Sequence, residues 1–153
     1  MDNNKRRGEL FEAFFYYTEN MNWKYKGKEI KNKEDLKDDI VGFVYLIVNK
    51  ITGERYVGKK ILVNKRTKPP LKGYKRRRVT YVESNWKTYT GSNSVTKTWG
   101  FEDCDRQILH QCINKTMMSY YEVKEQFERG VLESNKYLND NIQGKWYNDK
   151  IQK

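Results

Sequence analysis

Residues 42–60, GFVYLIVNKITGERYVGKK, limit what this chain can fold into more than any other part of the sequence. Residues 43–48 form an unbroken run of aromatic, β-branched and leucine side chains, which is typical of a β-strand. A turn-forming segment that contains Gly53 follows, and residues 55–57 resume the strand pattern before Gly58. The pattern predicts a β-hairpin.

The register of this hairpin follows from the length of its loop. If residues 50–53 form the loop, Ile47 lies opposite Tyr56, and Tyr45 lies opposite Gly58. Because alternate residues of a strand share a face, Tyr45 and Tyr56 point to the same side as diagonal neighbours. Gly58 has no side chain, so we expect two phenol hydroxyls to face one hollow.

Later segments predict a small α+β domain in residues 42–153. Residues 106–112 have the composition of a third strand, and residues 115–129 have apolar side chains at helical spacing. Tyr120, Val123 and Phe127 fall on one stripe of this helix, which we expect to pack on the sheet. The expected fold is a small antiparallel three-stranded sheet flanked by helices.

We expect residues 1–41 to form an N-terminal extension. Residues 7–19 predict a short helix, because apolar side chains recur at spacings of three and four. Residues 22–30 predict a small hairpin that turns at Lys26 and Gly27, and residues 32–39 predict a helical turn.

Positive charge is concentrated in one segment. The chain has 31 Lys and Arg against 20 Asp and Glu, and residues 59–78 alone hold ten basic residues and no acidic one. Pro69, Pro70 and Gly73 predict that this segment is a loop. A block this dense repels itself unless an anion lies against it, and nucleic acid is the expected anion. The alternatives are a solvated loop or a loop that docks an acidic partner.

Residue counts exclude several classes of site. His110 is the only histidine, which excludes two-histidine metal sites and His-Asn-His nucleases. Cys104 and Cys112 are eight positions apart, which fits neither a redox pair nor a zinc knuckle. The longest apolar run, residues 43–48, is far shorter than the roughly 18 residues that a membrane-spanning helix needs.

The hairpin resembles the core signature of the GIY-YIG endonucleases, in which one strand ends its motif in tyrosine and the next carries Tyr-x-Gly. Here the motifs are Phe43-Val44-Tyr45 and Tyr56-Val57-Gly58, with Phe43 where the family has glycine. Later stretches (PPLKG, ESNWKTYTGS, and YYEVKEQFERGVL followed by YLNDNI) resemble free-standing phage homing endonucleases of the Seg type. The resemblance covers roughly residues 42–142.

The resemblance implies a set of catalytic residues. The family's motif tyrosines correspond to Tyr45 and Tyr56, and its catalytic arginine, usually on a helix, corresponds to Arg66. Lys60 and Lys65 are alternatives to Arg66, because the Pro-containing basic segment interrupts the position of that helix.

The same resemblance implies Glu122 as the metal-binding glutamate, with Glu125 as second choice, and Asn139 as the asparagine near the end of the domain. One carboxylate suffices for Mg²⁺ (or Mn²⁺), because that ion keeps most of its waters and takes phosphate oxygens as ligands. Tyr45 would orient or deprotonate the attacking water, and we expect Lys59 and Lys60 to lower its pKa for that purpose.

The implied function is a divalent-metal-dependent endonuclease that cuts double-stranded DNA, as a phage homing enzyme in the host cytoplasm. A homodimer is compatible with this, because one active site cuts one strand at a time. The alternative is a catalytically inactive module that binds nucleic acid through residues 59–78. The expected nucleic-acid contacts are Lys59, Lys60, Lys65, Lys68, Lys72, Lys75, Arg76, Arg77, Arg78 and Trp86.

Overall fold

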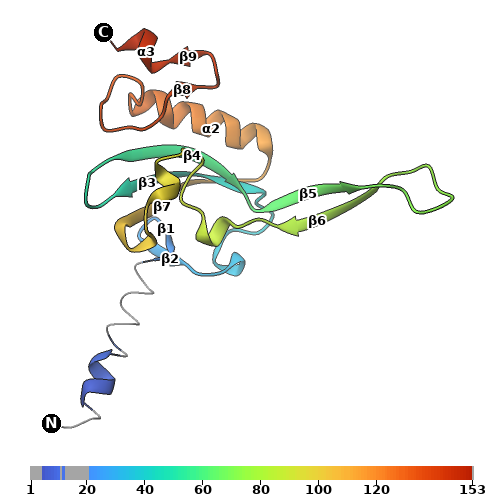
Figure 1. Cartoon of the computed structure of the whole chain (residues 1–153), viewed down its shortest axis with the longest axis horizontal. Helices are drawn as coiled ribbons and strands as arrows, with labels where there is room; N and C mark the ends of the chain where they lie inside the picture. Colours follow the sequence, from blue (N-terminus) through green and yellow to red (C-terminus); the bar gives the residue numbers. More distant parts are fainter. Residues whose placement is uncertain (1–4, 11, 13–20, 153) are drawn as a thin grey trace.

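The computed structural model describes residues 5–10, 12 and 21–152. Helix α2 covers one face of a mixed sheet, the C-terminal elements lie beyond α2, and a two-stranded arm projects from the body (Figure 1). The strands are β1 (Trp23–Tyr25), β2 (Lys28–Ile30), β3 (Gly42–Asn49), β4 (Arg55–Ile61), β5 (Val63–Lys68), β6 (Arg78–Glu83), β7 (Cys104–Cys112), β8 (Asn141–Ile142) and β9 (Trp146–Tyr147). The α-helices are α2 (Lys115–Glu128) and α3 (Asn148–Ile151), and the 3-10 turns are η1 (Lys33–Asp35), η2 (Trp86–Thr88), η3 (Thr96–Thr98) and η4 (Phe101–Asp103).

The predicted hairpin is strands β3 and β4, in the predicted register. Tyr45 lies opposite Gly58, and Ile47 lies opposite Tyr56. The loop closes where the Asn49 backbone N–H donates to the Glu54 carbonyl at 2.8 Å. The Asn49 side-chain oxygen also accepts hydrogen bonds from two loop amides, which fixes the turn locally.

The sheet is larger than the predicted three strands and is not fully antiparallel. Its order is β2-β1-β7-β3-β4, and β1 runs parallel to β7. The reason is the aromatic ring of Trp23, which is 1% exposed and packs on Phe43 and Tyr45 with centroid distances of 5.0 and 5.4 Å. Strands β1 and β2 pair as antiparallel neighbours, which confirms the predicted hairpin at residues 22–30. Because β1 also pairs with β7, this hairpin belongs to the core rather than to an extension outside it.

The first residues of the chain are described only in part. Residues 7–10 and 12 are helical, as predicted, and the remainder of the predicted 7–19 helix lies outside the described residues. The helical turn predicted at residues 32–39 is η1.

Helix α2 confirms the predicted helix, but of its predicted stripe only Val123 packs against the core. The Asn114 side chain caps its first turn by accepting from the Met117 backbone N–H at 2.7 Å. The buried residues are Met118 and Gln126, whereas Tyr120 and Phe127 of the predicted stripe are 64% and 50% exposed. The face of α2 that covers the sheet carries Met117, Met118, Tyr121 and Val123 together with Gln126, so it is turned partly away from the predicted stripe.

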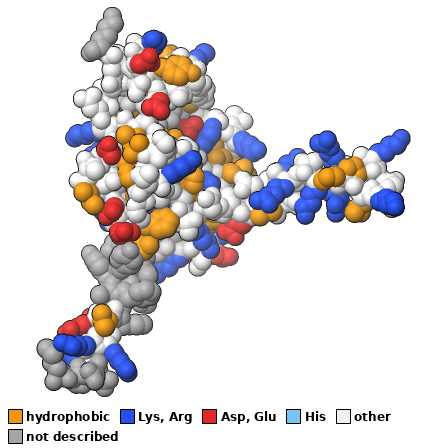
Figure 2. All heavy atoms as spheres, viewed as in Figure 1, with side chains coloured by type: hydrophobic (Ala, Val, Ile, Leu, Met, Phe, Trp, Pro, Cys, Tyr) orange, Lys and Arg blue, Asp and Glu red, His pale blue; other side chains and the backbone are white. Residues whose placement is uncertain are grey.

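The prediction that the basic segment is a loop is wrong. Most of this segment belongs to a β-hairpin arm. Strands β5 and β6 pair in register from Val63 with Glu83 to Lys68 with Arg78. Figure 2 shows Lys and Arg side chains gathered along this projecting arm. The prolines and Gly73 occupy only the connection at residues 69–77, so they end the strands instead of preventing them.

In the part of the chain that the structure describes, every helix is too short or too polar to cross a membrane.

Candidate active site

The sheet separates two clusters of buried side chains. Tyr45 and Tyr56 belong to the cluster around Trp23, on one face of the sheet. Val44 and Val57 belong to the cluster with Met118 of α2, on the other face. Helix α2 therefore covers the face opposite the tyrosine rings, and any site that joins tyrosine and glutamate must lie across the edge of β4.

Such a site exists as a polar hollow of about 330 Å³ at that edge. It is formed by Tyr56 of β4, by Glu122 and Gln126 of α2, and by residues from the segments before and after α2 in the chain. The other side chains that line it are Ser92, Asn93, Asn139, Asp140, Asn141 and Gln143.

Tyr56 is the tyrosine that reaches this hollow. Its hydroxyl is 2.7 Å from the Ser92 Oγ, in a solvent-exposed hydrogen bond. Burial raises the pKa of Tyr56 despite the Ser92 hydrogen bond, and Glu122 adds to the rise. Tyr56 is therefore a neutral phenol that can donate a hydrogen bond to an anion.

Tyr45 lies behind Tyr56 and is fully buried. The two rings are 6.3 Å apart between centroids, and a Cβ at Gly58 would lie 2.5 Å from the Tyr45 hydroxyl. The space opposite Tyr45 is thus filled by the end of its own ring, which explains why residue 58 is glycine.

The expected lowering of the Tyr45 pKa is wrong. Burial raises the pKa of Tyr45 well above its ordinary value, and the phenols of Tyr89 and Tyr56 raise it further. The Tyr89 side chain lies close enough to the Tyr45 hydroxyl to raise its pKa, but no group among the described residues completes a hydrogen bond of normal geometry with that hydroxyl. Lys59 points to the opposite face, so its charge does not offset this burial.

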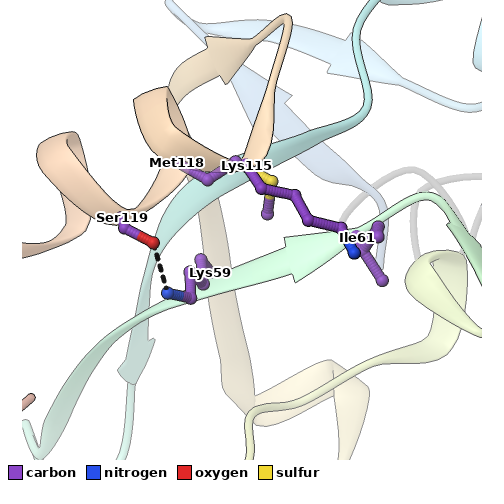
Figure 3. A pocket seen from close by; sticks show the side chains of 5 residues that line it. All are labelled: Lys59, Ile61, Lys115, Met118 and Ser119. Atoms are coloured by element: carbon purple, nitrogen blue, oxygen red, sulfur yellow. Dashed lines mark hydrogen bonds between the residues drawn. The ribbon is translucent and has the colours of Figure 1, made fainter.

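Glu122 meets Lys59 on the α2 side of β4. The Lys59 Nζ is 3.4 Å from the Glu122 Oε1 and donates a hydrogen bond of 2.9 Å to the Ser119 Oγ. Figure 3 shows Lys59 and Ser119 joined across the groove between β4 and α2, with Lys115 beside them. Burial raises the pKa of Glu122, and the Lys59 ammonium opposes this without cancelling it.

Glu125, the second choice for the metal ligand, is engaged elsewhere. Its carboxylate oxygens lie 2.7 Å from the His110 Nε2 and accept from the Arg129 Nε at 2.8 Å. Burial tends to raise the pKa of Glu125, but the hydrogen bonds from His110 and Arg129 outweigh it and lower the pKa. The structure therefore favours Glu122 over Glu125 as the carboxylate available to a ligand.

Asn139 holds the strand that carries Tyr56. Its side-chain amide donates to the Val57 carbonyl at 2.8 Å and accepts from the Val57 N–H at 3.1 Å. The Gln126 Nε2 donates to the same carbonyl at 3.3 Å. Asn139 is buried in these contacts, which tie the segment around residue 139 to β4 beside the hollow.

The three residues proposed as the catalytic cation, Arg66, Lys65 and Lys60, lie away from the hollow. Arg66 and Lys65 are exposed on β5 of the arm, on a strand instead of the expected helix. Lys60 donates to the Asn85 side chain at 2.7 Å, and its Nζ lies 3.9 Å from the centroid of the Tyr89 ring. The structure therefore brings Lys59, rather than Arg66, to Glu122.

Trp86 does not present its ring to nucleic acid. It is completely buried, its indole N–H donates to Glu83 at 2.9 Å, and its carbonyl accepts from the Trp23 indole at 2.7 Å. Trp86 was expected to contact nucleic acid, but its ring fills the core beside Phe43 instead.

A scan against protein-family models matches residues 23–151 to the model described as "Putative endonuclease segE, GIY-YIG domain". The chain belongs to the GIY-YIG family. The resemblance inferred from the sequence, including its Seg type, is thereby confirmed, and the match extends over β1 and β2. No curated protein and no solved structure matches the chain significantly.

Family membership supports a nuclease and, with it, a DNA substrate and a divalent metal. Within the described residues there is no group of three or more His, Cys, Asp and Glu side chains that could hold a metal by itself. The hollow nevertheless offers oxygen donors from Glu122 and Asp140, and the Gln126 Oε1 is buried without a hydrogen-bond partner. This all-oxygen set fits Mg²⁺, which needs only one or two carboxylates when substrate phosphate completes its shell.

Sequence reasoning missed Ser92, Ser119 and Gln126. Only Gln126 carried a signal, because it lies four positions after Glu122 and so falls on the same face of the helix. The two serines reach the site through the fold of the chain, which no spacing in the sequence indicates.

Glu122 and Glu125 should respond oppositely to replacement by glutamine. Glu122→Gln removes a half-buried charge, so it should raise the free energy of unfolding at pH 7, and the gain should shrink toward pH 4. The sign follows from the raised pKa: stability contributed by the protonated acid is lost as the pH rises through that pKa. Glu125→Gln should lose about 1.5–3 kcal/mol, because it breaks two charged hydrogen bonds.

Urea denaturation of both variants at pH 4 and pH 7 measures these effects. A loss of stability in Glu122→Gln at pH 7 would contradict the account, because it would show that the Lys59 ion pair outweighs burial.

Proposed function

We propose that this protein is a divalent-metal-dependent endonuclease that cuts double-stranded DNA, with its active site at the edge of β4. The observation that carries the proposal is the half-buried Glu122 carboxylate, which lies 3.4 Å from the Lys59 ammonium and shares the hollow with Tyr56. A carboxylate and a neutral phenol around one opening, with a cation paired to the carboxylate, suit the hydrolysis of a phosphodiester. The Seg-type match also supports a role in phage homing, exerted in the host cytoplasm.

Each of the three groups has a chemical task. Glu122 would hold Mg²⁺ or Mn²⁺, which supplies a Lewis acid for the phosphate oxygens and the leaving oxygen. Lys59 would neutralise charge that develops on the phosphate, an electrostatic effect typically worth a few kcal/mol. The Tyr56 hydroxyl, held by Ser92, would donate a hydrogen bond to phosphate or orient water at the mouth of the hollow.

The Tyr45 ring packs behind the Tyr56 ring. Its hydroxyl is unusual because it is buried without a well-formed hydrogen bond. A buried hydroxyl without a well-formed hydrogen bond costs about 1–3 kcal/mol, and a phenylalanine would avoid that cost. We propose that the hydroxyl is kept because it binds or positions the attacking water when DNA opens the edge. A phenol with a raised pKa is a poor base, so positioning fits it better than deprotonation.

The complete burial of Tyr45 also favours one other function, that of an inactive module that binds nucleic acid through its basic arm. Such a module would keep the charge on β5 and β6 without turnover. Cleavage and binding measured on the same protein separate the two functions.

The full chain should nick or linearise a supercoiled plasmid with Mg²⁺ or Mn²⁺ and should do neither with EDTA. Glu122→Gln should abolish cleavage while binding to the same plasmid persists, because the carboxylate is lost and the arm is not. Glu128→Gln, which removes an exposed carboxylate from the same helix, is the matched control and should cut normally. Cleavage that survives in Glu122→Gln, or in EDTA, would refute the metal role of Glu122.

Tyr45→Phe should make the protein more stable and less active. We expect the free energy of unfolding to rise by about 1 kcal/mol and the cleavage rate to fall by about tenfold or more. Tyr121→Phe, at a ring that stacks on His110 away from the hollow, should leave cleavage unchanged. A Tyr45→Phe variant that cuts at the wild-type rate would show that the hydroxyl only packs.

A further inference from the structure

The β5–β6 arm carries features that are unfavourable unless a ligand covers them. In the described part of the chain, β5 and β6 form a sheet only with each other, and most of their side chains are exposed. A lone two-stranded hairpin is marginally stable in water. Lys68 also lies directly opposite Arg78, and like charges in that position repel. The arm therefore suits a polyanion better than it suits bulk water.

The register of the arm sorts its side chains onto two different faces. Residues directly opposite each other share a face, and so do alternate residues of one strand. One face has three cations, two short polar side chains, one valine and no acid: Asn64, Arg66, Lys68, Arg78, Thr80 and Val82. The other has one cation, one acid and mostly uncharged side chains: Val63, Lys65, Thr67, Val79, Tyr81 and Glu83.

We propose that the arm is a β-ribbon that enters the major groove of double-stranded DNA and reads base edges with the face that carries Arg66. The proposal rests on the proposed function and assigns to the arm the sequence preference of the same enzyme. The major groove is about 12 Å wide and admits a two-stranded ribbon, and Arg and Asn are the side chains that pair with guanine and adenine there. The A-form RNA groove is too narrow for such a ribbon.

The connection at residues 69–77 has a different task. It carries Lys72, Lys75, Arg76 and Arg77 at the end of the arm, all of them exposed. Flexible cations of this kind bind phosphates of any sequence, so they add affinity without base preference.

The base of the arm is fixed to the strand that forms the active site. Leu62, between β4 and β5, is buried, and its carbonyl accepts from the Ser84 N–H at 2.8 Å. The Ser84 hydroxyl also donates to the Ile61 carbonyl at 2.6 Å. A ribbon anchored on both strands holds a set distance from the hollow.

That distance limits where the recognised bases can lie. Lys68 is nine positions after Lys59, so the ribbon reaches at most about 30 Å from Lys59 at about 3.3 Å per residue. This corresponds to about nine base pairs at about 3.4 Å each. The recognised bases should therefore lie within about nine base pairs of the cut.

Selection from a pool of random-sequence DNA duplexes tests the proposal without requiring cleavage. The probe protein is the full chain with Glu122→Gln, and the variants add Arg66→Ala or Lys65→Ala. These neighbours lose the same charge from opposite faces of the ribbon, so they are matched. We expect a preferred motif, which Arg66→Ala weakens by about tenfold at one or two base positions, whereas Lys65→Ala lowers binding to all sequences alike and keeps the motif.

The ribbon proposal is overturned if Arg66→Ala and Lys65→Ala act alike, if no motif emerges, or if RNA duplexes compete as well as DNA. The proposed function fails separately. A motif that depends on Arg66, in a wild-type protein that does not cut, supports the ribbon and refutes the nuclease. Cleavage whose base preference is unchanged by Arg66→Ala supports the nuclease and refutes the ribbon.

Discussion

The pair of hydrogen bonds between the Asn139 side chain and the Val57 backbone is the contact on which the candidate site depends. Strand β4 is the edge of the sheet, so its outer N–H and C=O groups lack a neighbouring strand. The Asn139 amide offers one acceptor and one donor in the positions where a neighbouring strand would offer them. It thereby closes the edge at Val57 and holds Tyr56 and Gly58 on either side.

The attachment of the segment around Asn139 to β4 also explains why the candidate site lies across the two faces of the sheet. Segment 136–139 runs beside β4, where the Arg55 N–H donates to the Lys136 carbonyl and the Leu138 N–H donates to the Arg55 carbonyl. This leaves an opening at the strand edge, where Tyr56 arrives from one face and Glu122 from the other. An edge site has a physical advantage for a long substrate, because DNA can approach an open edge without entering a closed pocket.

The sequence predicted local pairing well. The apolar run in residues 43–48, the turn at Gly53 and the position of Gly58 fix a register that the structure reproduces. These features are local, so spacing determines them. The burial of Trp23 against β3 could not be predicted, because it depends on a parallel pairing between strands far apart in the chain. The predicted buried stripe of α2 was wrong in part: Val123 packs against the core, but Tyr120 and Phe127 are exposed. Gln126 and Glu122 instead contact β4, through a hydrogen bond and an ion pair.

Of the candidate site, the motif tyrosines and Glu122 could be proposed from the sequence, but their arrangement could not. Arg66 followed from a spacing that assumes a helix, and the chain has a strand there. Lys59 was expected to touch DNA, yet only the fold places it beside Glu122.

Titration of Mn²⁺ into the isotope-labelled full chain, followed by paramagnetic broadening of backbone amide signals, tests the location of the site most directly. The account predicts that signals around Tyr56, Lys59 and Glu122 broaden first, and that Glu122→Gln removes this effect. Broadening centred on His110 and Glu125, or confined to the arm, would contradict it.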